Sequence, residues 1–278
     1  MQVAEQVRSG SSRLLAGPRR EALIVGTSFG TLVSMVLDTV VATVISLRRG
    51  RFAWREFVDQ AWFLASVSIL PTLLIAIPFG TVVVLEVGGL ADQIGANSYV
   101  GAVDAITTVR DAAPIVTALL LATAGGSAIT ADLGSRSVRE EIDAMVVLGL
   151  NPLERLVGPR VLATMFVSVM LNFVVAFTAI LAGYVTDVLL LHGTAGAYLD
   201  SFSAFAQPSD IIVSIIKAAV FGFLAAVIAS YKGLHTKPGP SGVGQAVTET
   251  VVAAGVSLFV ANLVITQFYL TIAPPRIF

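Results

Sequence analysis

The sequence contains no cysteine and few charged residues, and each shortage excludes a class of protein. Without cysteine there is no disulfide, no thiolate nucleophile and no Cys-ligated metal site. Asp, Glu, Lys and Arg make up 13% of the 278 residues, whereas an ordinary soluble domain carries about 25%. The net charge of −1 provides no overall basic field for nucleic acid. Together with 56% apolar residues, this composition excludes a water-soluble enzyme.

Long stretches without any charged residue predict membrane-spanning helices. Four such stretches cover 61–85, 112–131, 161–186 and 250–275. Each is long enough to cross a hydrocarbon core of about 30 Å, which takes about 20 helical residues. Because lipid offers the backbone no water to bond, apolar segments of this kind form helices. We therefore predict an all-α integral membrane protein with spans near 60–87, 110–132, 158–187, 209–231 and 246–272.

Basic residues in the short loops predict the orientation, because Lys and Arg near span ends favour the cytoplasm. They occur in the loops 48–55, 133–160 and 232–245, whereas the loops 86–109 and 187–210 contain acidic residues and no Lys or Arg. The first three loops are expected in the cytoplasm and the last two outside. In this multi-pass protein of the cell (cytoplasmic, or inner) membrane, the N-terminus is then inside and the C-terminus outside.

The apolar segment at about 22–47 differs from the five spans, because clusters of Arg flank it on both sides. A spanning helix would leave one of these clusters outside the cell. We therefore expect an interfacial or re-entrant helix on the cytoplasmic leaflet, with a sixth span as the alternative. The chain is thus divided into an N-terminal region at 1–56 and a membrane-spanning domain at 57–278.

The loop between the second and third spans predicts an amphipathic helix at 137–148. Ser137 followed by Glu140 has the spacing of a capping box, and Gly149 and Pro152 end the helix. Apolar residues recur at helical spacing on one face, and carboxylates lie on the other. A helix lying on a membrane normally presents Lys and Arg to anionic lipid. An acidic face suits a groove on a protein partner instead, and a solvated loop helix is the alternative.

Residues 124–163, AGGSAITADLGSRSVREEIDAMVVLGLNPLERLVGPRVLA, resemble the signature of the MlaE/YrbE family of ABC-transporter permeases. The stretches 57–80 and 239–257 are also similar to that family. The Arg-Glu-Glu-Ile-Asp-Ala-Met form that begins at Arg139 is most similar to YrbE subunits of actinobacterial Mce (mammalian cell entry) lipid-import systems. One departure is conservative: the family usually has Ala-Glu-Leu-Gly before the loop, where this chain has Asp132 in place of Glu.

The resemblance implies a fold, partners and a site. It implies an elbow helix followed by five spans, with a permease domain at 57–278. The loop helix would be a coupling helix that docks into a separate cytoplasmic ABC ATPase, which would bind ATP and Mg²⁺, while this chain binds no cofactor. A second YrbE-type permease, forming a heterodimer, and an extracytoplasmic ring of Mce proteins would complete a lipid or fatty-acid transporter. The implied coupling residues are Arg139, Glu140, Glu141, Asp143, Ala144 and Met145.

The chain itself carries no catalytic pattern, so we expect no enzymatic activity. None of its lysines follows a glycine-rich phosphate-binding loop, which excludes a P-loop. His192 and His235 are predicted on opposite sides of the membrane and cannot share a metal ion. Serines such as Ser127 have no nearby His to activate them as nucleophiles.

Side chains inside the spans are mostly apolar, which favours an apolar cargo over sugars or ions. Lys217 is the exception: it is either a substrate-path or gating residue, with Asp111 or Asp210 as partner, or a helix-end charge at the outer headgroups. Gly125, Gly126 and Ser127 either pack helices closely or border the path. An ATP-driven lipid permease is therefore the main hypothesis. The alternatives are a carrier of a hydrophobic substrate driven by an ion gradient through Lys217, Asp111 or Asp132, and an intramembrane enzyme acting on lipid.

Overall fold

The computed structural model describes residues 52–272 without interruption and eight positions between residues 36 and 48. Within these residues the secondary structure is helical, with no strand. In chain order the elements are α2 (Trp54–Gln93), η1 (Asn97–Tyr99), α3 (Val100–Ile106), η2 (Thr107–Ala112), α4 (Ala113–Leu120), η3 (Leu121–Gly125), α5 (Gly126–Val138), α6 (Glu141–Val147), η4 (Leu153–Val157), α7 (Gly158–Leu190), α8 (Ala195–Phe205), α9 (Pro208–Leu234) and α10 (Pro240–Ile272).

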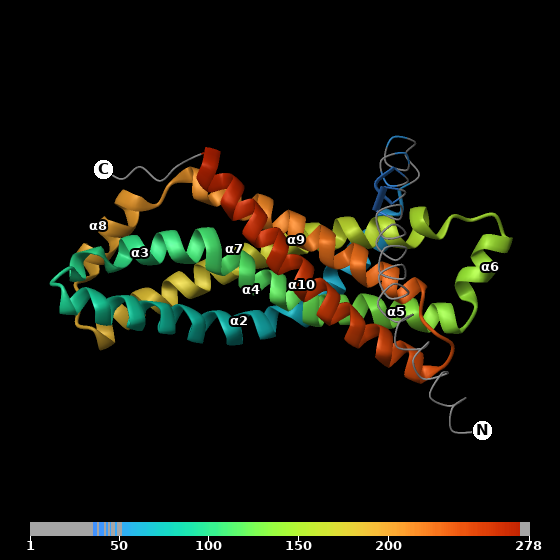
Figure 1. Ribbon diagram of the computed structural model, residues 1–278, viewed down its shortest axis with the longest axis horizontal. Coiled ribbons are helices and arrows are strands. Elements are labelled where there is room, and N and C mark those ends of the chain that lie inside the picture. Colours follow the sequence, from blue (N-terminus) through green and yellow to red (C-terminus); the bar gives the residue numbers. More distant parts are fainter. Residues whose placement is uncertain are drawn as a thin grey trace, which may run out of the picture.

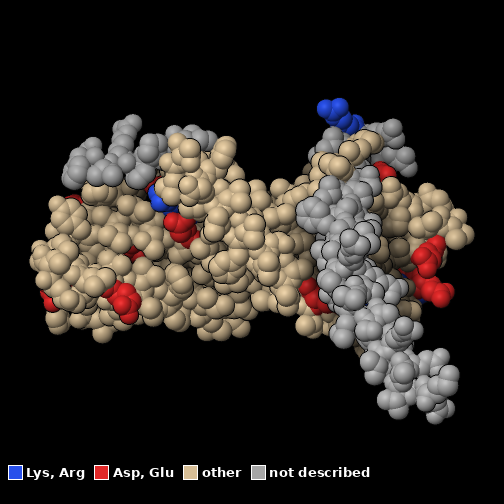
Figure 2. All heavy atoms as spheres, in the orientation of Figure 1, with Lys and Arg blue, Asp and Glu red and all other residues tan. Residues whose placement is uncertain are grey.

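Five helical segments are long and apolar enough to cross a membrane, which confirms the all-α integral membrane class. They are Trp54–Gln93, Asn97–Val138, Leu153–Leu190, Pro208–Leu234 and Pro240–Thr271. Figure 1 shows them running along the length of the molecule, with α6 near one end and α3 and α8 near the other. We call these the α6 end and the α8 end. On the face drawn in Figure 2, charged side chains gather toward the two ends, and the tan band between them shows no charged residue.

The long helices form for the reason that the sequence suggested, and they extend well past the apolar band. The charge-free stretch 61–85 of α2 is about 37 Å long at 1.5 Å per residue, close to the thickness of a bilayer core. Helix α2 as a whole has 40 residues, so it projects beyond that band. Pro71 and Pro78 lie inside it without ending it.

Helix α2 packs against α7 through a stripe of mostly small residues. Its buried positions recur every four residues or so: Leu64, Ser68, Thr72, Ala76, Gly80, Val84, Gly88 and Ala91. At Gly80 the backbones approach so closely that an added Cβ would overlap the carbonyl oxygen of Ala179. In lipid, helices gain little from burying apolar groups against each other, so close backbone contact of this kind holds them together.

The core lies where α5, α7, α9 and α10 meet. Phe221 of α9 is fully buried at its centre. Hydrogen bonds between helices tie the same region: the Thr130 hydroxyl donates to the carbonyl of Ala229 at 3.1 Å and lies 2.9 Å from the Thr250 hydroxyl. The second span is mostly buried, whereas α10 is mostly exposed, so the two differ sharply in what they contact.

The second span is interrupted by two π-helical turns, η2 and η3, and a third, η4, precedes α7. Each inserts an extra residue per turn and shifts the face that the following residues present. Hydrophobic patterning carries no signal for such insertions, and the sequence did not predict them. Turns of this type are frequent at functional sites, and η2 contains Arg110 and Asp111.

The predicted interfacial helix at 22–47 lies largely outside the described residues. The eight described positions between 36 and 48 are helical, and the side chains of Thr39 and Thr43 are buried. Thr43 packs on Gly158 at the start of α7, where an added Cβ would lie 2.6 Å from the Thr43 hydroxyl. These positions therefore contact the α6 end of the bundle.

Candidate functional site

The loop that contains α6 is built differently from the capping-box helix expected at 137–148, and that prediction is wrong. Ser137 belongs to α5, and its hydroxyl donates to the carbonyl of Leu234 at 3.3 Å instead of capping a helix. Glu140 adopts a left-handed conformation with φ of 59°, and α6 begins only at Glu141. The physical reason is the reversal of the chain: α5 must end in a sharp turn before α6 can start, so one continuous helix does not form.

Helix α6 presents both carboxylates and apolar side chains to its surroundings. Glu141 and Asp143 are exposed, as predicted for the outward face, and Ala144 is exposed beside them. Met145 is half-buried and packs on the core. Val147 and Leu148 have 87% and 74% of their surface exposed, which is unusual for large apolar residues outside the membrane-spanning helices. Exposed apolar residues rimmed by charge are typical of a surface that binds another protein.

Arg139 and Glu140, the first two predicted coupling residues, lie in the turn itself. The Arg139 guanidinium contacts the Glu141 carboxylate at 3.0 Å, and both side chains are exposed. An exposed pair of this kind contributes at most about 1 kcal/mol, so it leaves both groups available to a partner. The backbone carbonyl of Glu140 accepts the first hydrogen bond of α6 from the amide of Ala144.

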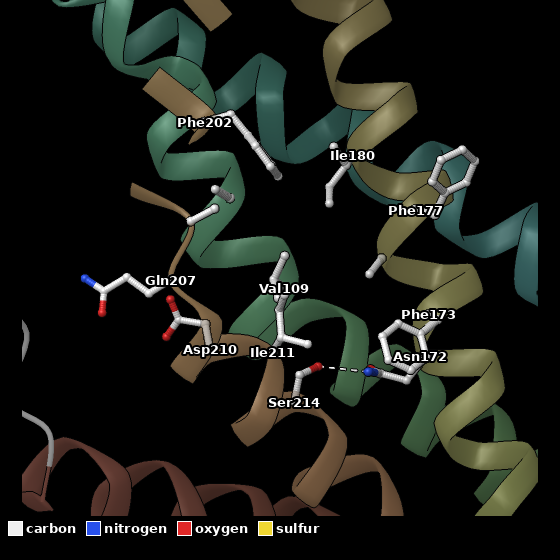
Figure 3. Close-up of a pocket in the computed structure, with 13 residues that line it drawn as sticks. Val109, Asn172, Phe173, Phe177, Ile180, Phe202, Gln207, Asp210, Ile211 and Ser214 are labelled. Atoms are coloured by element: carbon white, nitrogen blue, oxygen red, sulfur yellow. Dashed lines mark hydrogen bonds between the residues drawn. The ribbon is translucent and has the colours of Figure 1, made fainter. Parts of the chain in front are cut away.

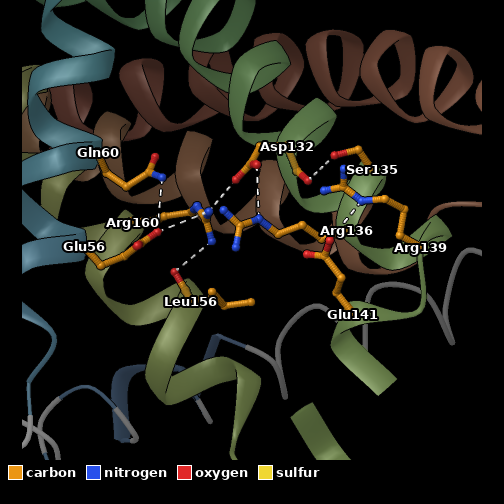
Figure 4. Close-up of polar contacts among 9 residues, drawn as sticks. All are labelled: Glu56, Gln60, Asp132, Ser135, Arg136, Arg139, Glu141, Leu156 and Arg160. Carbon is orange, nitrogen blue, oxygen red and sulfur yellow. Dashed lines mark hydrogen bonds and ion pairs between the residues drawn. The ribbon is translucent and has the colours of Figure 1, made fainter. Parts of the chain in front are cut away.

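A buried arginine lies beneath this loop and was not among the residues predicted for the site. Arg160, in the first turn of α7, is fully buried (Figure 4). Its Nη2 forms an ion pair with Asp132 of α5 and lies 3.3 Å from Glu56 Oε1, in the first turn of α2. Its Nη1 donates to the carbonyl of Leu156 at 3.4 Å. One guanidinium thus joins three helices at the base of the α6 loop.

The Arg160 network extends toward α6 through the second carboxylate oxygen of Asp132. Arg136 Nε contacts Asp132 Oδ1 at 3.2 Å, so Asp132 lies between two arginines. A planar guanidinium donates to two carboxylates in a fixed geometry that a lysine would not reproduce. The sequence did contain a signal for this network: Asp132 and Arg160 are opposite charges at the two ends of a loop that returns the chain to the same side. A hairpin of helices brings such residues together.

Lys217 forms a buried ion pair inside the membrane-spanning region. Only 1% of its side chain is exposed, and its Nζ donates to Asp111 Oδ1 at 2.8 Å and to the carbonyl of Arg110 at 3.0 Å. Of the two predicted partners, Asp111 is therefore found. Asp210 instead accepts a hydrogen bond from the Tyr269 hydroxyl at 3.1 Å. Lys217 is buried between helices, and the choice between a path or gating residue and a helix-end charge stays a prediction.

Gly125, Gly126 and Ser127 lie where η3 passes into α5. An added Cβ on Gly125 would lie 3.5 Å from Leu64 Cδ2, and one on Gly126 would lie 3.4 Å from Thr250 Cγ2. Both glycines are buried, and Ser127 is half-buried. An added Cβ would thus make nearly ordinary van der Waals contacts with α2 and α10, and the choice between packing residues and path residues stays a prediction.

At the α8 end, a second buried carboxylate holds α8 against α3. The Tyr198 hydroxyl donates to Asp104 Oδ2, and the Thr108 hydroxyl donates to Oδ1 at 2.7 Å. Burial raises the pKa of the Tyr198 hydroxyl above its ordinary value, and the neighbouring Asp104 carboxylate raises it further. Tyr198 therefore stays protonated and remains a donor. Across the described residues there is no group of three or more metal-ligating side chains.

Comparison with known proteins places these features in a family context. A family model described as Permease MlaE matches residues 57–268. A probable ABC transporter permease protein of Rickettsia felis is 28% identical over 228 residues, covering 82% of this chain and 88% of that protein. One of Synechocystis sp. is 30% identical over 218 residues, covering 78% and 83%. The Arabidopsis thaliana protein TRIGALACTOSYLDIACYLGLYCEROL 1, chloroplastic, is 30% identical over 230 residues, covering 81% and 65%.

Proposed function

This chain belongs to the MlaE permease family, and from that premise we propose that it moves lipid or fatty acid across the cell membrane, driven by a separate ABC ATPase that docks on α6. The ATPase would bind ATP and Mg²⁺, and this chain would bind no cofactor. A second YrbE-type permease and an extracytoplasmic ring of Mce proteins would complete the assembly. The α6 end would face the cytoplasm, together with the N-terminus, and the C-terminus would lie outside.

The observation that carries this proposal is the Arg160 network beneath the α6 loop. A force applied to α6 by a partner is useful only if it reaches the membrane-spanning helices. Because Arg160 joins α7 to Asp132 of α5 and to Glu56 of α2, movement of the loop would shift three helices together. The exposed acidic and apolar surface of α6 supplies the contact, and the buried guanidinium supplies the rigid base.

Two further observations support lipid as the cargo and a second permease as a partner. The outward surface of the long helices is apolar, and α10 in particular is barely buried by the rest of the described chain. An apolar surface of this extent would be covered by lipid or by a second membrane subunit. The name of the Arabidopsis relative contains that of a galactolipid, which is consistent with lipid transport among relatives.

Charge reversal on α6 tests the coupling proposal. We expect Glu141→Lys and Asp143→Arg to abolish both transport and co-purification with the ATPase, while membrane insertion stays normal. Asp200→Arg is the matched control, because Asp200 is an exposed acidic residue on α8 at the opposite end. Transport and co-purification at the wild-type level in both α6 variants would refute a coupling role for this helix.

The second candidate is a carrier of a hydrophobic substrate driven by an ion gradient, which the buried pair of Lys217 and Asp111 favours. Ionisable groups buried in a membrane are candidates for proton or ion pathways. Dissipating the proton gradient while ATP is maintained separates the two functions. We expect transport to continue, and arrest of transport under these conditions would favour the carrier.

A further inference from the structure

A cavity of about 240 Å³ opens within the single chain, between α3, α7, α8 and α9 (Figure 3). It is larger than the cavity of about 150 Å³ that takes up benzene in an engineered protein interior. Its walls are mostly apolar side chains: Val109, Phe173, Phe177, Ile180, Phe202 and Ile211. Neither the Arg160 network nor the Lys217 pair lines it, so it is separate from the sites described above.

The apolar walls and the polar groups of the cavity lie on different sides. Phe177 is 71% exposed and Ile211 47% exposed, so they form a rim on the outside of the bundle. Phe173 and Phe177 belong to the charge-free stretch 161–186, which places this rim against lipid. Of the four polar lining residues, Asn172, Ser214 and Asp210 are buried and Gln207 is exposed. A molecule entering from the lipid side would therefore meet apolar groups first and polar groups at the bottom.

One buried hydrogen-bond acceptor among the residues that line the cavity has no donor. Asn172 Nδ2 donates to Ser214 Oγ at 2.8 Å, as Figure 3 shows, but Asn172 Oδ1 has no hydrogen-bond partner among the described residues. A buried amide oxygen without a partner costs free energy, of the order of 1–3 kcal/mol. The oxygen itself is buried, so a ligand in the cavity would donate to it, and recover that cost, once the Asn172 side chain turns it toward the cavity.

The charge of the lining restricts the class of ligand further. Asp210 contributes a carboxylate, one oxygen of which accepts from Tyr269, and Gln207 lies beside it. No Lys or Arg is among the described residues that line the cavity. A phosphate or carboxylate headgroup would meet an acidic residue with no compensating cation, which is unfavourable in a low-dielectric site. Hydroxyl groups, which donate to amide and carboxylate oxygens, fit this lining.

We propose that this cavity binds one uncharged single-chain lipid with a hydroxyl-bearing headgroup, of the monoacylglycerol type, taken sideways from the bilayer. The headgroup hydroxyls donate to Asn172 Oδ1 and to the Asp210 carboxylate, and the acyl chain leaves past Phe177 and Ile211 into the membrane. A volume of 240 Å³ suits a glycerol group with the first part of one chain, and the remaining chain stays in lipid.

Photolabelling of the full-length protein in nanodiscs tests the site. The probe is a monoacylglycerol with a diazirine in the first half of its chain, and labelled peptides are identified by mass spectrometry. We expect labelling within 172–180 and 207–214. Unlabelled monoolein should reduce this labelling at least tenfold more effectively than oleic acid, which lacks the glycerol and carries a charge. Equal competition by the two lipids, or labelling elsewhere only, would overturn the proposal.

Two variants test the geometry. Ala176→Trp should fill the cavity and abolish specific labelling, and Asn172→Leu should reduce it about five- to tenfold by removing the acceptor. Ala65→Trp is the matched control: it fills a separate cavity of about 370 Å³ between α2 and α7, which is lined by apolar side chains. Labelling that survives Ala176→Trp, or falls equally in Ala65→Trp, would refute the site. The competition between monoolein and oleic acid is measured on the wild-type protein, so it tests the site even if a variant fails to fold.

Discussion

Arg160 and Asp132 are 28 residues apart in sequence and form an ion pair at the base of the α6 loop, with the guanidinium fully buried. Asp132 lies on the helix that leads into the loop, and Arg160 lies on the helix that leads out of it. Glu56 completes the contact from α2, which precedes both. The pair therefore closes the loop as a hairpin and makes its base one mechanical unit.

Replacing this guanidinium should destabilise the protein strongly. Arg160→Met removes the buried cation between the carboxylates of Asp132 and Glu56, and only Asp132 keeps a second one, Arg136. Leaving a fully buried charge unpaired costs about 3–5 kcal/mol, and we expect a smaller loss here, because the remaining carboxylates are partly hydrated. The measurement is thermal unfolding in detergent. Arg136→Met is the control, since its pair with Asp132 is partly exposed and should cost less than about 1 kcal/mol.

The two partners of the intramembrane ion pair should respond unequally. Asp111→Asn leaves Lys217 charged and fully buried, whereas Lys217→Met leaves Asp111, whose side chain is 35% exposed. We therefore expect Asp111→Asn to destabilise by about 3–5 kcal/mol and Lys217→Met by distinctly less. The double variant should cost less than the sum of the two single changes, because neither charge remains unpaired. Equal costs in a double-mutant cycle would argue against burial of Lys217.

Two glycines of α2 offer a matched test of how closely the helices pack. Gly80→Ala places a Cβ into the backbone of α7 and should separate the helices, with a loss of stability. Gly89 has open space around its Cβ position. Gly89→Ala should therefore be neutral or stabilising, by up to about 1 kcal/mol, because Ala favours a helix over Gly. Similar melting temperatures for the two variants would contradict the close contact of α2 and α7.

The hydrogen bond between Tyr198 and Asp104 predicts a pH dependence in the alkaline range. The pKa of Tyr198 is higher in the folded than in the unfolded protein, so this group adds stability below its unfolded pKa of about 10. That contribution is lost as the pH rises above about 10 toward the folded pKa. Tyr198→Phe should be less stable than wild type at pH 7, with a difference that narrows above about pH 10. Tyr99→Phe, at an exposed site, is the control for loss of a tyrosine hydroxyl in the same series of melts.

Composition and charge spacing were enough to predict the all-α membrane class and five apolar helices, because spans in lipid must be long, apolar and helical. The Lys217 and Asp111 pair was within reach for the same reason, since a charge in a span needs a partner. The left-handed turn at Glu140 and the π-helical turn that contains Asp111 could not be predicted from the sequence. Local patterns do not record how a chain reverses or where it inserts a residue. Arg160 was missed because its burial depends on two other helices.

The orientation of the bundle can be tested directly because the chain contains no native thiol. Ser203 is exposed at the α8 end, and Ser241 is exposed at the start of α10, near the α6 end. If the basic loops face the cytoplasm, Ser203→Cys should react with a membrane-impermeant maleimide in intact cells, whereas Ser241→Cys should react only after permeabilisation. The unsubstituted chain provides the zero level for both. The opposite pattern would place α6 outside the cell, away from any ATP, and would remove the basis for coupling to an ATPase.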